Sequence, residues 1–152
     1  MKTAYVGIGA NLGDRERTLR RALELLGARA GVRVAAVSAL RETDPVGFLD
    51  QPRFLNGAAR VETELAPRAL LGALLEVERQ LGRDRSGPRY GPRTVDLDLL
   101  LYDDVELDED GLTLPHPRLH ERRFALEPLA ELDPALVVPG RGPVAALLAE
   151  LD

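Results

Sequence analysis

TVDLDLLLY, residues 94–102, has the alternating pattern of a buried strand, in which successive side chains point to opposite faces. One predicted face is wholly apolar and consists of Val95, Leu97, Leu99 and Leu101. The other face consists of Thr94, Asp96, Asp98 and Leu100. Because Asp is depleted in strands and like charges repel, this second face is a candidate functional site.

Upstream of this strand, the sequence alternates between strand and helix patterns. Strands are predicted at residues 4–9, 32–41 and 54–63, and helices at residues 14–28 and 67–82. Together with residues 94–102 they give the order βαββαβ, which predicts a ferredoxin-like α+β core with an antiparallel sheet packed by helices. C-terminal additions come after this core, ending in a helix at about residues 143–151.

The boundaries of the two core helices carry local signals. Asn11 or Asp14 is expected to cap the first helix, and Gly27 or Gly31 to end it. Pro67 is expected in the first turn of the second helix, where its missing N–H is of no consequence.

The composition excludes several classes of protein. The 152 residues predict a single domain, 1–152, and the absence of cysteine excludes disulfides, thiolate zinc sites and a cysteine nucleophile. No apolar run approaches the about 18 residues of a membrane span and no signal-peptide pattern is present, so a cytoplasmic protein is expected. The formal net charge of −5 argues against a general nucleic-acid binder.

The two carboxylates of the strand suit a divalent cation. Asp96 and Asp98 are expected side by side, roughly 6.5 Å apart along the strand. Mg²⁺ would reverse their repulsion, because it favours one or two carboxylates together with substrate phosphates. The alternative is an exposed strand face that merely tolerates both charges.

An arginine cluster directly precedes the strand, in the glycine- and proline-rich segment 82–93. Its members are Arg83, Arg85, Arg89 and Arg93. Guanidinium groups bind phosphate oxygens through paired hydrogen bonds and stay charged, so a cluster beside a carboxylate pair favours a polyphosphate clamp. A solvated basic loop is the other interpretation.

Four further residues have both a structural and a functional interpretation. Glu78 falls on the apolar face of the helix at 67–82, where a buried carboxylate is costly unless it is paired. Its partner is either an Arg or an N–H group of a ligand, or else Glu78 forms a salt bridge at the edge of the helix. Phe54 and Phe124 are two of only three phenylalanines, and core packing is their ordinary use. His116, between two prolines, is either a phosphate or ribose contact or a residue fixed in a turn; His120 is expected at the surface.

Three runs of sequence resemble blocks of one enzyme family. They are RYGPRTVDLDLLLY at 89–102, LPHPR at 114–118 with ERRF at 121–124, and DQPRFLN at 50–56. In this order, over about residues 3–140, the chain is similar to the 6-hydroxymethyl-7,8-dihydropterin pyrophosphokinase (HPPK) family of folate biosynthesis. The resemblance implies that the β,γ-diphosphate of ATP is transferred to the pterin hydroxymethyl group, releasing AMP. It also implies a ferredoxin-like core.

The resemblance also implies roles for individual residues. Asp96 and Asp98 would be catalytic and would hold two Mg²⁺ ions that bridge the phosphates of ATP. The residues expected to contact ATP, of which Arg83 and Arg93 would be catalytic, are Leu71, Arg83, Arg85, Arg93, Leu99, His116 and Arg122. The residues expected to contact the pterin are Thr43, Val46, Phe54, Asn56, Glu78 and Phe124. Tyr90 and Asp44 depart from the family pattern, where Trp and a Pro pair are common.

Two alternatives of function remain at this level. The first is a non-catalytic ferredoxin-like module that binds RNA or a small molecule, although the acidic charge and the lack of paired strand aromatics argue against RNA. The second is a kinase that transfers a single phosphoryl group. With ATP and the pterin as partners, a monomer without nucleic-acid or membrane partners is expected.

Overall fold

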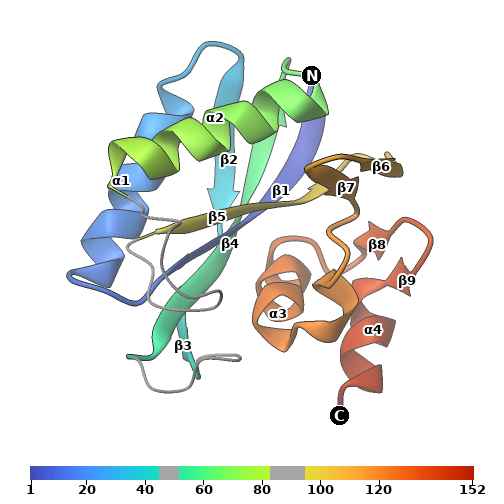
Figure 1. Cartoon of the computed structure of the whole chain (residues 1–152). Helices are drawn as coiled ribbons and strands as arrows, with labels where there is room; N and C mark the ends of the chain where they lie inside the picture. Colours follow the sequence, from blue (N-terminus) through green and yellow to red (C-terminus); the bar gives the residue numbers. More distant parts are fainter. Residues whose placement is uncertain (45–51, 83–94) are drawn as a thin grey trace.

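The computed structural model describes residues 1–44, 52–82 and 95–152. The elements of the core are β1 (Lys2–Ala10), α1 (Arg15–Gly27), β2 (Val32–Val37), β3 (Arg41–Thr43), β4 (Phe54–Thr63), α2 (Pro67–Gln80) and β5 (Asp96–Tyr102) (Figure 1). The C-terminal elements are β6 (Leu107–Glu109), β7 (Leu112–Leu114), a 3₁₀ turn η1 (Leu119–Glu121), α3 (Arg123–Leu132), β8 (Val137–Val138), β9 (Gly142–Pro143) and α4 (Val144–Glu150).

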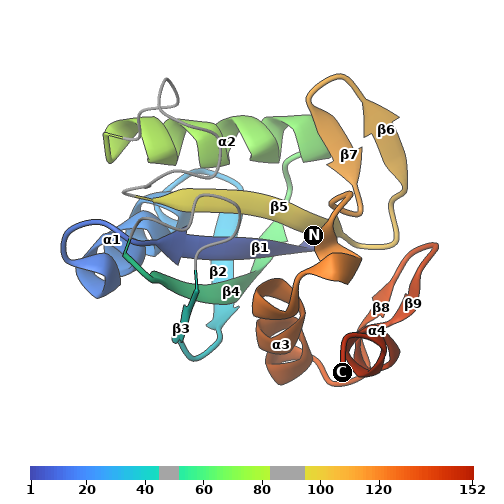
Figure 2. The ribbon, with the colours of Figure 1, turned by 60° about the horizontal axis from the view of Figure 1, so that its bottom comes forward.

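The main sheet has the strand order β2-β4-β1-β5, and β3 also pairs with β4. Every pair in it is antiparallel. Helices α1 and α2 lie on one face, and α3 lies on the other (Figures 1 and 2). The predicted ferredoxin-like α+β core is therefore confirmed, with the last core strand at one edge of the sheet.

The predicted strand at 32–41 is divided in the structure into β2 and β3. The reason is a tertiary contact that replaces the regular ladder between them. The Ser38 hydroxyl accepts a hydrogen bond from the Ala58 amide at 2.9 Å, and the Ala39 amide donates to the Glu131 carboxylate of α3 at 2.8 Å. Between the two strands the register against β4 shifts by one residue, from Val37 opposite Ala59 to Arg41 opposite Asn56.

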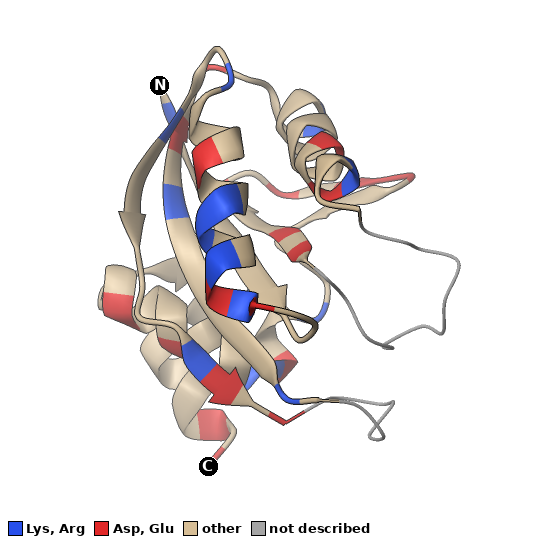
Figure 3. Cartoon of the chain, turned by 90° about the vertical axis from the view of Figure 1, so that its left-hand side faces the viewer, with Lys and Arg blue, Asp and Glu red and all other residues tan. Residues whose placement is uncertain are grey.

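The helix boundaries follow local signals. Asp14 caps α1 by accepting a hydrogen bond from the Arg17 amide at 3.2 Å, whereas Asn11 is buried and donates to the Pro52 carbonyl at 3.0 Å. Helix α1 ends at Gly27, and α2 begins at Pro67, as predicted. Figure 3 shows charged residues of both signs along α1. Its exposed Arg20 and Arg21 form ion pairs with Glu16 and Glu24, each one turn away on the same helix.

Apolar side chains form two clusters, one on each face of the sheet. The larger cluster, between the sheet and helices α1 and α2, contains Val6 and Ile8 of β1 and Leu70, Leu74 and Val77 of α2. The smaller cluster, between the sheet and helices α3 and α4, includes Tyr5, Ala58, Leu126, Leu129 and Leu147. The sheet is thus covered on both sides, by the core helices and by the C-terminal additions.

One residue of β5 departs from the predicted alternation. Leu101 was expected beside Leu97 and Leu99, but it belongs to the smaller cluster together with Leu100. The cause is a β-bulge against β1, where Tyr5 pairs with Leu101 and Val6 pairs with Leu99, which leaves Leu100 as the extra residue. The expectation for Leu101 was wrong because a bulge depends on the neighbouring strand.

The C-terminal additions extend beyond the single helix predicted at 143–151. That helix is α4, and it is accompanied by α3 and by the hairpins β6-β7 and β8-β9. None of the helices in the described ranges has the length and apolar character needed to span a membrane.

Candidate active site

The central strands bring polar residues together on the face of the sheet that α3 covers in part. Gly9 of β1 pairs with Asn56 of β4 on one side and with Asp96 of β5 on the other. Neighbouring strands are about 4.8 Å apart, so about 10 Å separates the backbones of Asn56 and Asp96. Ala58, two residues after Asn56, belongs to the smaller cluster and identifies the face.

Asp96 and Asp98 lie half-buried on this same face, as the sequence predicts. Leu97 and Leu99, which alternate with them, are buried in the larger cluster on the opposite face. Within the described ranges, no group of three or more His, Cys, Asp or Glu side chains is placed to hold a metal. Two carboxylates fit Mg²⁺ nevertheless, because this ion commonly completes its octahedron with waters and substrate phosphates.

His116 is held beside this acidic pair by its own backbone. Its amide donates to the Leu100 carbonyl of β5 at 2.9 Å, and its ring Nδ1 accepts from the Arg118 amide at 3.2 Å. Burial and the positive charges of Arg122 and Arg118 lower the pKa of His116 to about 4, and Asp96 only partly opposes them. The ring is therefore neutral at pH 7, with Nε2 as its N–H donor.

Asn56 is fixed between two strands by its carboxamide. It is 8% exposed, and its Nδ2 donates a hydrogen bond to the Thr43 hydroxyl of β3. Phe54, two residues earlier in β4, pairs with Thr43 and lies on the same face as Asn56 by strand alternation. The structure thus brings together Thr43, Phe54 and Asn56, three of the residues expected to contact the pterin.

Phe124 and Arg122 lie at the start of α3. The Arg122 guanidinium carbon is 5.6 Å from the centre of the Phe124 ring, a cation–π distance. Phe124 is half-buried and packs against the smaller cluster, on the same side of the sheet as Phe54. Both aromatic rings predicted for the pterin therefore lie on one side of the sheet, from different elements.

Leu71, Leu99 and Glu78 lie on the other side of β5, towards α2. Leu99 is 5% exposed in the larger cluster and Leu71 packs against that cluster. Glu78 is 2% exposed, and its Oε2 accepts a hydrogen bond from the Leu97 amide at 2.8 Å. This backbone partner is one that the sequence did not predict, and it ties α2 to β5. A ligand that contacts both Leu71 and Asp98 must pass around the edge of β5.

Several predicted site residues lie outside the described ranges. They are Val46, Arg83, Arg85 and Arg93. Tyr90, one of the two departures from the family pattern, lies there as well.

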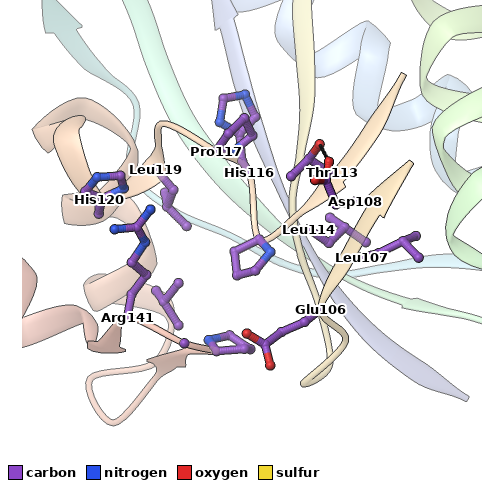
Figure 4. A pocket seen from close by; sticks show the side chains of 14 residues that line it. Glu106, Leu107, Asp108, Thr113, Leu114, His116, Pro117, Leu119, His120 and Arg141 are labelled. Carbon is purple, nitrogen blue, oxygen red and sulfur yellow. Dashed lines mark hydrogen bonds between the residues drawn. The ribbon is translucent and has the colours of Figure 1, made fainter. Parts of the chain in front are cut away.

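A cavity of about 560 Å³ adjoins His116 between the hairpins β6-β7 and β8-β9 (Figure 4). Its polar lining comes from Glu106, Asp108, Thr113, His116, His120 and Arg141. Sequence patterns singled out only His116 as a functional residue. His120, expected at the surface, keeps 26% side-chain exposure and lines this cavity. Arg141 could not have been found, because nothing local links the β8-β9 hairpin to residue 116.

The fold and this site define a ferredoxin-like α+β domain that presents a carboxylate pair beside a neutral histidine, an arrangement suited to phosphate transfer. Residues 5–134 match the family of 7,8-dihydro-6-hydroxymethylpterin-pyrophosphokinase (HPPK). The chain belongs to this family, whose members are ATP-dependent transferases.

Curated relatives agree over most of the chain. The 2-amino-4-hydroxy-6-hydroxymethyldihydropteridine pyrophosphokinase of Bacillus subtilis is 49% identical over 129 residues, which are 85% of this chain and 77% of the relative. The protein of the same description from Methylorubrum extorquens is 45% identical over 152 residues, covering 100% of this chain and 95% of the relative.

Solved structures agree in fold. The wild-type HPPK-DHPS of Plasmodium falciparum, crystallised with pteroate, matches with a TM-score of 0.76 at 12% identity. The match covers 98% of this chain but 42% of the solved chain, so this chain spans less than half of that protein. At such low identity the match establishes the fold alone.

Proposed function

We propose that this chain transfers the β,γ-diphosphate of ATP to the hydroxymethyl group of 6-hydroxymethyl-7,8-dihydropterin, using the face of the sheet that carries Asn56, Gly9 and Asp96. Membership of the family supports this reaction, and a relative named as a folic acid synthesis protein supports its place in folate biosynthesis. The comparisons do not favour a non-catalytic binding module, since these relatives are named as pyrophosphokinases.

One observation supports the use of this face in particular. Asn56 and Asp96 flank the same residue of β1, at a backbone separation of about 10 Å. An acceptor ring held at Asn56 therefore has its reactive group within a few ångströms of phosphates held at Asp96. Such positioning is the main contribution that proteins make to phosphoryl transfer.

The acidic pair is the proposed metal site. Asp96 and Asp98 would hold the two Mg²⁺ ions expected from the family resemblance, with water and phosphate oxygens as further ligands. When bound, Mg²⁺ neutralises charge on the phosphates and so favours attack by the pterin oxygen on the β-phosphorus.

The remaining residues have proposed roles in binding. The neutral His116 offers Nε2–H to an oxygen of ATP, and Arg122 supplies positive charge close by. Phe54 and Phe124 would stack on the two faces of the pterin, Asn56 would bind its edge, and Thr43 and Val46 would belong to the loop that covers it. Glu78, also expected to contact the pterin, is instead buried on the opposite face of β5 and would support the site through the Leu97 amide. Leu71 and Leu99 would flank the adenine.

The arginines of segment 83–93 complete the proposal. Arg83 and Arg93 would stabilise the charge that develops on the transferred group, and Arg85 would bind ATP. The segment 82–93 that carries them would exclude water from the site, because hydrolysis of ATP competes with transfer to the pterin.

Phosphorus NMR of the protein with ATP, Mg²⁺ and verified reduced pterin tests the reaction. The expected products are AMP and a pterin diphosphate, formed only when the pterin is present. ADP with a pterin monophosphate would indicate transfer of a single phosphoryl group instead. No turnover would overturn the proposed reaction and leave a binding module.

Four properties of the molecule as a whole stay predictions. They are a single pyrophosphokinase domain over 1–152, a monomeric state, a cytoplasmic location and the absence of nucleic-acid partners. Sedimentation of the purified protein across a concentration series, with and without ATP, decides the oligomeric state.

A further inference from the structure

Gly9 lies at the centre of the proposed site, although sequence patterns give it no role there. It is the residue of β1 that pairs with both Asn56 and Asp96. Its φ is not among the positive values that favour glycine, so the backbone itself would accept another residue at this position. The need for glycine must therefore come from the space above it.

That space is occupied by the Asn56 carboxamide. A Cβ atom on Gly9 would lie 2.5 Å from Asn56 Oδ1, far inside van der Waals contact, and its next neighbours would be 3.6 Å or more away. Asn56 is 8% exposed and its Nδ2 is already bonded to Thr43, so the carboxamide has little freedom to rotate away. Thr43 thus holds the carboxamide in the space that the missing side chain of Gly9 leaves open.

Gly7 provides a comparison on the same strand and the same face. A Cβ atom there would meet only the side chain of Leu100, with a nearest distance of 3.3 Å. The flexible end of a leucine can move by a few tenths of an ångström, whereas the Asn56 carboxamide is held by a hydrogen bond. A side chain at Gly9 would therefore displace the Asn56 carboxamide, whereas a side chain at Gly7 would only shift Leu100.

We propose that Gly9 is a positioning residue for the acceptor ring, because the absence of its side chain leaves room for the orientation in which Thr43 holds the Asn56 carboxamide. The inference rests on the proposed function, since it takes Asn56 as a contact of the pterin. An amide presents a donor and an acceptor in one plane, so its orientation determines which edge of a bicyclic ring it can match. Gly9 would therefore act on recognition of the pterin and not on binding of ATP.

Steady-state kinetics of Gly9→Ala and of the matched control Gly7→Ala test this proposal. In Gly9→Ala, KM for the pterin should rise about tenfold, as expected for one hydrogen bond lost in a desolvated site, with KM for ATP unchanged. Gly7→Ala should leave both constants unchanged. Equal increases of both constants in Gly9→Ala would overturn the proposal, because the new methyl group would then be acting through Asp96.

Double variants show whether the effect passes through Asn56. If it does, Gly9→Ala in an Asn56→Ala background should add no further increase of KM for the pterin. A further increase of similar size would overturn the proposal. Should Gly9→Ala alone fail to fold, recovery of folding in Gly9→Ala/Asn56→Ala supports the contact, and failure of both variants contradicts it.

The wild-type protein separates this inference from the proposed function. If wild type forms no pterin-dependent AMP, the function fails. If wild type is active and Gly9→Ala behaves like Gly7→Ala, the function stands and the inference is wrong.

Discussion

The two faces of the sheet are built from the same strands but carry different residues. On the face covered by α1 and α2, β1 contributes Val6, Ile8 and Ala10 to one continuous apolar cluster. On the other face the same strand contributes Tyr5, which is packed by the C-terminal helices, and then two glycines. On this face, β1 therefore has no side chains at the end of the strand that pairs with Asn56 of β4 and Asp96 of β5.

Because of this difference, we expect one face of the sheet to contribute mainly to stability and the other mainly to function. Burial of apolar area stabilises the α1/α2 face, because the hydrophobic contribution to folding scales with the area removed from water. At one end, the other face carries the buried Asn56 and the half-buried Asp96 and Asp98, next to which a ligand can bind. Substitutions on the two faces should therefore have effects of different kinds.

The largest effect is expected from Asp98→Ala, on the face that carries the acidic pair. Turnover should fall about a thousandfold or more, because charge on the transferred phosphates is no longer neutralised, while the free energy of unfolding stays near the wild-type value. AMP formation and urea denaturation measure the two quantities. The exposed Asp104→Ala is the matched control, and near-normal turnover in Asp98→Ala would contradict the metal assignment.

The opposite kind of effect is expected from Leu74→Ala, on the α1/α2 face. Leu74 is 0% exposed, so its truncation should lower the free energy of unfolding by about 3 kcal/mol and leave KM for both substrates unchanged. Urea denaturation measures the loss. Leu151→Ala, at an exposed position, should cost under about 0.5 kcal/mol. A large rise in KM for Leu74→Ala would show that the two faces are not independent.

A smaller effect is expected where α3 is attached to the sheet. Glu131 accepts from the Ala39 amide, and its carboxylate lies 2.6 Å from the Arg41 guanidinium. These partners lower the pKa of Glu131, so its contribution to stability is present above the ordinary pKa of 4.5 and is lost as the pH falls below it. Glu131→Gln should cost about 0.5 kcal/mol at pH 7, because the pair is partly exposed.

Denaturation at several pH values checks this prediction. The difference between wild type and Glu131→Gln should shrink as the pH falls below 4.5. A difference that is constant down to pH 3 would mean that the charge of Glu131 is not what holds α3. Glu150→Gln, at an exposed position of α4, serves as the control.

The core order was predictable because each element carries its own signal. The short apolar run in β1, the alternation in β5, the spacing of leucines in the helices, and local markers such as Asp14 and Pro67 are all visible within a few residues. The break after β2 was not visible, since it depends on the Ser38–Ala58 and Ala39–Glu131 bonds between distant segments. The β-bulge at Leu100 escaped prediction for the same reason.

The candidate site was predictable in part. Asp96 and Asp98 share a face because strand alternation requires it, and the structure confirms this. The Leu97 amide as a partner of Glu78, and Arg141 as a neighbour of His116, required the tertiary fold. The roles expected for the arginines of segment 83–93 stay predictions.

The bulge at Leu100 shifts the phase of β5. Before it, even-numbered residues of the strand face α3; after it, Leu101 does so, and Tyr102 turns back to donate its hydroxyl proton to the Leu65 carbonyl at 2.7 Å. A change of length by one residue between Asp96 and Leu100 would move a carboxylate to the buried face of the strand. At Leu100 the same change would leave Asp96 and Asp98 in place and alter only the residues from Leu101 onwards. In the course of evolution, β5 can therefore gain or lose a residue there without disturbing its acidic pair.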